Sequence, residues 1–101
     1  MHGFVKNTVI KAIQDKSVLH FTYDGHARTA EPHAVGCSTA GNDVVRCFQT
    51  AGTSSEGKVP DWKLMLLSDI RNLVVGPETF AATRPGYKQG DKGMSVIYAE
   101  I

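Results

Sequence analysis

The sequence predicts a mainly β protein: one N-terminal helix followed by five or six short antiparallel strands that form a small, strongly bent sheet or partly open barrel. Three observations lead to this fold class. Apolar residues recur at helical spacing only near the N-terminus, they alternate with polar residues from residue 18 onward, and turn-forming residues separate the later apolar runs.

The stretch NTVIKAIQDK, residues 7–16, is predicted to form the helix. A polar residue at position 7 or 8 can cap its start, and Val9, Ile10 and Ile13 make one apolar stripe. Because a helix of about three turns is too short to be stable alone, this stripe must pack against the rest of the protein.

The first strand is predicted from residue 18, in VLHFTYD, where apolar and polar residues alternate. Asp24 and Gly25 suit a tight hairpin turn, because glycine accepts positive φ and aspartate tolerates it. The chain then returns over residues 27–37. Pro32 cannot donate a hydrogen bond to a neighbouring strand, so it marks an edge position, a bulge or a bend.

The later elements follow from short apolar runs between polar segments. WKLMLL is the most apolar of these runs, and SDIRN after it is predicted to be a turn or a short helical piece. The predicted strands are 44–48, 62–67, 73–75 and a possible terminal strand at 96–101, and the predicted mobile or exposed loops are 51–61 and 83–95.

Composition limits the class of protein. A chain of 101 residues is expected to be a single domain, and 42% hydrophobic with 21% charged residues is ordinary for a globular fold. The net charge of +1 gives no bulk attraction for nucleic acid, so such a site would need local clustering. The sequence has no membrane-spanning run and no secretory signal, and its two cysteines form no disulfide framework, so a cytoplasmic protein without a membrane partner is expected.

One block of the sequence resembles the WYL domain. In FTYDGHARTAEPH, the residues at the spacing of that family are Phe21, Tyr23, Gly25, Arg28, Pro32 and His33. The later stretch WKLMLLSDI is similar to a further strand of the family, and the resemblance covers residues 9–80. It leaves 81–101 as a loop and a possible terminal strand.

The resemblance implies an Sm-like, SH3-type barrel and a role as a ligand sensor in bacterial transcription regulators or defence systems. It also implies that the ligand is a nucleic acid, often single-stranded, held in a basic groove. The chain departs from the family at Asp43, Val44 and Val45, where the tripeptide that names it would fall, and at Leu66 and Asp69, where the family carries arginines. These changes affect the ligand inference more than the fold inference.

Arg28, His33 and Arg46 are the leading candidates for an anion-binding groove. The guanidinium of Arg28 can hold a phosphate or carboxylate through two hydrogen bonds, or it can form a surface ion pair with Glu31. His33 can contact a phosphate or base, or its ring can bond a backbone carbonyl. Arg46 lies either at a rim or in a polar groove.

Further candidates are Tyr23 and Lys63, together with the late-loop residues Arg84, Tyr87, Lys88 and Lys92. Tyr23 offers a stacking face, but it shares its strand face with Leu19 and Phe21, so core packing is the alternative. Trp62 is interpreted as a core cover, with a stacking platform as the alternative, and Lys63 is either solvated or bound to the ligand. The basic residues around Tyr87 can follow a nucleic-acid backbone or belong to a solvated loop.

No catalytic set is predicted. The four histidines show no metal-ligand spacing, and the sequence has no nucleophile elbow or phosphate-binding loop, so neither a metal nor a cofactor is expected. The sequence therefore predicts a non-catalytic regulatory module that binds a nucleic acid or nucleotide-like anion. The alternative is an assembly module that forms a homo-oligomer or joins a partner with a helix-turn-helix.

Overall fold

The computed structural model describes residues 2–55 and 57–101, apart from the side chain of residue 2. It contains one helix and a six-stranded antiparallel sheet, so the prediction of a mainly β fold with an N-terminal helix is confirmed. The elements are α1 (His2–Asp15), β1 (Ser17–Tyr23), β2 (His26–Ser38), β3 (Asp43–Gly52), β4 (Asp61–Leu66), the 3₁₀ turn η1 (Leu67–Asp69), β5 (Arg71–Thr79) and β6 (Met94–Glu100). The predicted loop 51–61 includes residue 56, which lies outside the described residues.

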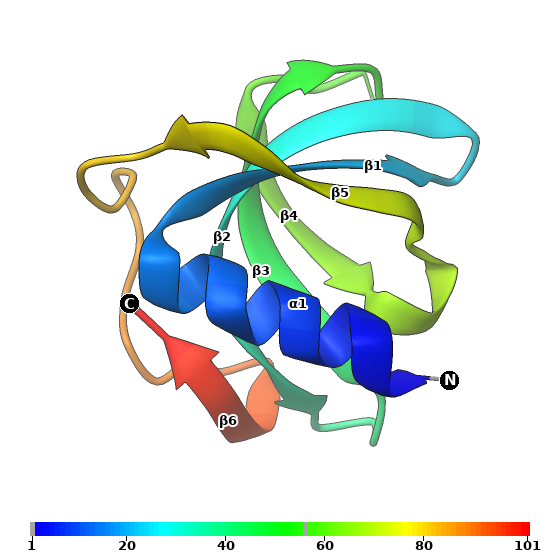
Figure 1. Ribbon diagram of the computed structural model, residues 1–101. Helices are drawn as coiled ribbons and strands as arrows, with labels where there is room; N and C mark the ends of the chain where they lie inside the picture. Colours follow the sequence, from blue (N-terminus) through cyan, green and yellow to red (C-terminus); the bar gives the residue numbers. More distant parts are fainter. Residues whose placement is uncertain (1, 56) are drawn as a thin grey trace.

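The strand order is β4-β3-β2-β1-β5, with β6 paired to β2. Within the described part of the chain, β4 and β5 end this path without pairing to each other, so the sheet is not closed into the predicted barrel. The sheet is nevertheless strongly bent, and α1 lies across its hollow side between β5 and β6 (Figure 1). No helix of the described residues is long and apolar enough to cross a membrane.

The long strand β2 changes its neighbour at Pro32. Its first part pairs with β1 as far as Ala30, and its second part pairs with β6 from Ala34 onward. The pairing of β2 with β3 also shifts register between Pro32 and Ala34. Proline, which lacks an N–H, therefore lies where the outer neighbour of β2 is missing, which confirms the predicted bulge.

The main core forms between α1 and the hollow side of the sheet. The predicted helical stripe supplies Val9 and Ile13, which are almost completely buried, while Ile10 is partly buried against the same cluster. From the sheet, the alternating positions of β1, β2, β3 and β4 contribute the remaining side chains, which include Leu19, Phe21, Ala30, Val35, Val45, Cys47 and Met65. Period-two strands and a period-3.6 helix thus meet at one apolar layer.

The helix and several strands are longer than the sequence pattern indicated. The helix begins at residue 2 rather than 7, and β5 spans nine residues where only 73–75 were predicted. Most residues of β5 are exposed, so the apolar pattern that reveals a half-buried strand is absent there. The predicted short helical piece is confirmed as η1.

Candidate functional site

The segment of residues 80–93, here called the strap, connects β5 to β6 and runs down one side of the molecule (Figure 1). It contacts the face of β3 opposite the core, because Arg46 lies between the buried residues Val45 and Cys47. Two ion pairs hold it there. Arg84 donates from Nε and Nη2 to the two carboxylate oxygens of Glu31 on β2, both at 2.8 Å. Asp91 accepts from Nε and Nη2 of Arg46 on β3, at 2.7 and 3.1 Å. The predicted late loop is therefore fastened to the sheet at two points.

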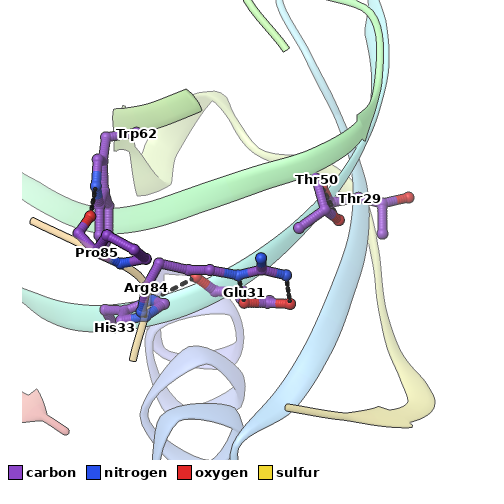
Figure 2. A network of polar contacts seen from close by, with 7 residues as sticks. All are labelled: Thr29, Glu31, His33, Thr50, Trp62, Arg84 and Pro85. Carbon is purple, nitrogen blue, oxygen red and sulfur yellow. Dashed lines mark hydrogen bonds and ion pairs between the residues drawn. The ribbon is translucent and has the colours of Figure 1, made fainter. Parts of the chain in front are cut away.

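The carboxylate of the first ion pair, that of Glu31, is well buried. The side chain of Glu31 is only 8% exposed, and the guanidinium of Arg84 lies 5.0 Å from the ring centre of Phe48. Figure 2 shows the Arg84 side chain extended along Glu31, with His33 beneath it. Glu31 thus pairs with Arg84 and not with Arg28, so the surface ion pair considered for Arg28 is wrong.

His33 is completely buried under the strap, and both of its ring nitrogens are used. Nδ1 lies 2.9 Å from the carbonyl oxygen of Glu31, and Nε2 lies 3.2 Å from the backbone nitrogen of Arg84. Because the Arg84 N–H can only donate, Nε2 must accept, and Nδ1 carries the proton. Burial lowers the pKa of His33, so the ring is held neutral.

Aromatic rings surround His33. The Phe80 ring stacks on it at 5.3 Å between centroids, and the rings of Trp62 and Tyr87 approach at 4.8 and 5.2 Å. The Trp62 indole N–H donates to the carbonyl of Pro85 at 3.0 Å (Figure 2). The strap is therefore packed on the sheet as well as ion-paired to it.

A hollow of about 450 Å³ opens between the strap and strands β3 and β4. Its lining includes both cationic and aromatic side chains, and the residues are Arg46, Trp62, Gly86, Tyr87, Lys88, Gln89, Gly90, Asp91 and Lys92. The Trp62 and Tyr87 rings lie 6.2 Å apart at an angle of 25° and form one wall. Lys88 and Lys92 are exposed, and neither has an ion-pair partner among the described residues.

Arg28 lies on the other face of the sheet from this hollow. Its side chain contacts Gln49, which is three residues after Arg46 on the regular part of β3 and so points to the opposite face. Arg28 is 5% exposed and donates to the Tyr23 carbonyl from Nε and Nη2, at 3.2 and 3.1 Å. The structure therefore does not bring Arg28 and Arg46 to a shared groove.

Tyr23 and Lys63 lie on the same face as Arg28. Tyr23 packs against the core, and its hydroxyl accepts the Leu66 N–H at 3.1 Å, which is the core-packing alternative. Lys63 is 7% exposed, not solvated, and its Nζ donates to the Ser54 hydroxyl at 3.2 Å. These residues, with His33, support the local fold in the free protein.

Four of the nine predicted site residues line the hollow: Arg46, Tyr87, Lys88 and Lys92. Arg84 lies next to it but is engaged with Glu31. Sequence reasoning preferred Trp62 as a core cover over a stacking platform, whereas it forms a wall of the hollow, and it missed Asp91 as the partner of Arg46. No local sequence signal indicates that Asp91 pairs with Arg46, because the two residues are 45 positions apart.

The described residues contain no group of three histidine, cysteine or acidic side chains that could hold a metal ion. The thiol of Cys47 is buried beside Met65, and burial raises its pKa to about 12 despite the nearby cations Arg28 and Arg46. A thiol with this pKa carries almost no thiolate at neutral pH, so Cys47 has the properties of a core residue.

No protein-family model matches this chain, and no curated protein or solved structure is significantly similar to it. The resemblance to the WYL domain therefore stays a prediction.

Proposed function

We propose that this protein is a cytoplasmic, non-catalytic regulatory module that binds a nucleotide or a short single-stranded nucleic acid in the hollow beside the strap. The observation that carries the proposal is the lining itself. Lys88, Lys92 and Arg46 supply positive charge, and Trp62 with Tyr87 supplies an aromatic wall. A ligand that combines phosphate with a flat base matches both features.

The regulatory role and its bacterial setting rest on the resemblance to the WYL domain, as does the kinship of the bent sheet with Sm-like and SH3-type barrels. The hollow supports a different set of contacts from the groove predicted from the sequence. Arg46 is common to both sets, whereas Arg28 and His33 support the fold around it. The proposed ligand site is therefore built mainly from the strap.

Binding is tested by titrating a fluorescein-labelled oligothymidylate at low salt and following its anisotropy. Trp62 is the single tryptophan of the chain, so quenching of its fluorescence by AMP or by the oligonucleotide reports contact with the wall. Replacing Lys88 and Lys92 together by alanine is expected to weaken binding and to reduce the salt slope by about 0.7 for each lost phosphate contact.

A matched control replaces Lys11 and Lys58, which are exposed and do not line the hollow. This double variant has the same change in net charge, so it is expected to bind nearly as well as the unmodified protein. An absence of binding at low salt would refute the proposal. If the two double variants lose the same amount of affinity, binding is a nonspecific attraction between charges and does not involve the hollow.

A second candidate function is self-assembly through the edge of β5. The strand carries two exposed apolar side chains, Val74 at 59% and Val75 at 45%, and its described partner is β1 alone. Antiparallel pairing of two copies would bring Arg71 of one strand near Glu78 of the other, so the edge is complementary to itself in charge.

Light scattering distinguishes this candidate from ligand binding. A dimer that forms without oligonucleotide, and that Val74→Lys dissociates, would support assembly. Val96→Lys is the control, because Val96 is similarly exposed at 53% but lies on β6. Arg71→Glu or Glu78→Arg alone should weaken the dimer. The two changes together exchange the charges and should restore it. A monomer at all concentrations would refute this candidate.

A further inference from the structure

The guanidinium of Arg46 is already occupied in the free protein. Asp91 accepts from its Nε at 2.7 Å and from its Nη2 at 3.1 Å, so a carboxylate takes both donors of one edge. This two-point geometry is the one by which arginine recognises the carboxylate or phosphate of a ligand. Both side chains also line the hollow, where Arg46 is 30% and Asp91 10% exposed.

Asp91 is held in this position from its own side of the pair as well. The Gly93 N–H donates to Oδ1 at 2.8 Å, and the carbonyl of Asp91 accepts from Met94 at 3.1 Å. The hydrogen bond from Arg46 keeps the pKa of Asp91 below its ordinary value. The carboxylate is therefore ionised and in place throughout the neutral pH range.

Glycines lie on both sides of Asp91 in the strap. Gly90, just before Asp91, has φ of +73°, a conformation that glycine adopts at little cost, and no atom lies within 4 Å of the position that a Cβ would take there. Gly93 follows two residues later. Asp91 thus lies on a glycine-flanked turn of the strap, while Arg46 is fixed in the middle of β3.

We propose that Asp91 is an internal competitor for the anion site: its carboxylate occupies Arg46 in the free protein, and the phosphate of the bound ligand replaces it. The inference rests on the proposed function and specifies its chemistry. A phosphate monoester, as in AMP, carries about 1.5 to 2 negative charges at neutral pH against one for the carboxylate. Each internal phosphodiester of an oligonucleotide carries one charge, and there Lys88 and Lys92 supply the additional attraction that lets the ligand replace Asp91.

The exchange gives the strap two arrangements. In the free protein both ion pairs close it onto the sheet, and in the complex the Glu31–Arg84 pair remains while Asp91 is released. Binding energy is then partly used to break the Arg46–Asp91 pair. Removing the competitor should therefore strengthen binding, which is the opposite of what a supporting carboxylate would do.

The test compares Asp91→Asn with the unmodified protein, using the labelled oligothymidylate and, separately, inorganic phosphate detected by Trp62 fluorescence. Asparagine has the shape of aspartate without its charge, so the strap is expected to keep its path. We expect affinity for the oligonucleotide to rise about threefold to tenfold. The salt slope should change little, because the phosphate contacts Arg46 in both proteins and releases the same counterions from the nucleic acid.

Two controls separate competition from other effects. Asp15→Asn changes net charge equally on the exposed end of α1, and Glu31→Gln loosens the strap at its other ion pair. Neither is expected to reproduce the gain. In an Arg46→Gln background the gain from Asp91→Asn should vanish, because the contested guanidinium is missing.

Each outcome bears on the inference. Weaker or unchanged oligonucleotide binding by folded Asp91→Asn, while the unmodified protein binds, overturns the competitor role and leaves the proposed function standing. A gain that persists without Arg46, or that Asp15→Asn also produces, overturns it as well. Failure of both proteins to bind any probe overturns the proposed function, and the competitor role with it.

Discussion

Acidification should weaken the contact between His33 and the strap and so destabilise the folded protein. In the folded protein Nδ1–H donates to the Glu31 carbonyl, and Nε2 accepts the backbone N–H of Arg84. A second proton on the ring would place an Nε2–H against that N–H. It would also add positive charge to a fully buried site beside the guanidinium of Arg84. The Glu31 carboxylate partly offsets this, but burial is the larger effect.

The sign follows from the lowered pKa of His33 in the folded state. The unfolded chain takes up its proton near the ordinary pKa of 6.5, whereas the folded protein resists protonation until a lower pH. Between these two values the unfolded state binds more protons, so the stability due to His33 is complete above about pH 6.5 and falls as pH decreases. The slope is up to about 1.4 kcal/mol per pH unit for one proton.

Urea unfolding at several pH values between 7.5 and 5.5 measures this slope directly. His33→Gln removes the titrating ring, so it should be less stable at neutral pH but should lose up to about 1.4 kcal/mol less than the unmodified protein per unit of acidification. Val35→Ala, a core change that retains His33, should keep the original slope. Parallel curves for the unmodified protein and His33→Gln would refute the reasoning.

Two further changes test the packing. Gly36→Ala should destabilise the protein by about 1–3 kcal/mol in thermal unfolding, because the added Cβ would meet the carbonyl oxygen of Val96 on β6. An unfolding free energy equal to that of the unmodified protein would show that this close contact does not matter. Gly3→Ala on α1, with open space around it, is the control that should cause no loss. Iodoacetamide at pH 8 should leave Cys47 unmodified until urea unfolds the chain, since burial raises its pKa to about 12, and native labelling at the unfolded rate would contradict that burial.

The elements that the sequence predicted best are those with one buried and one exposed face. The alternation of Leu19, Phe21 and Tyr23 placed β1, and Pro32 marked the bulge where β2 changes its neighbour. The nine-residue β5 was underestimated because it lies at the sheet edge with both faces largely exposed. Its extent depends on pairing with β1, which single-sequence periodicity does not report.

The candidate site was predicted less well because its residues meet through tertiary structure. Arg28 was selected as an anion binder, but burial at 5% exposure directs its guanidinium to the carbonyl of Tyr23. Whether an arginine on a strand reaches solvent depends on the face it occupies, and the register shifts of β2 change that face along its length. The pairing of Arg46 with Asp91, which is 45 residues away, has no local sequence signature.

The arrangement of the two ion pairs explains how the strap keeps one register on the sheet. At one point the acid is on the sheet, in Glu31, and the base is on the strap, in Arg84; at the other the base is on the sheet, in Arg46, and the acid is on the strap, in Asp91. A displacement that moved Arg84 toward Arg46, or Asp91 toward Glu31, would oppose like charges in partly buried surroundings. The reversed polarity therefore disfavours other placements while it stabilises this one. For the same reason, displacement of Asp91 by the proposed ligand would not let the strap slide, because the pair at Glu31 would still specify the position.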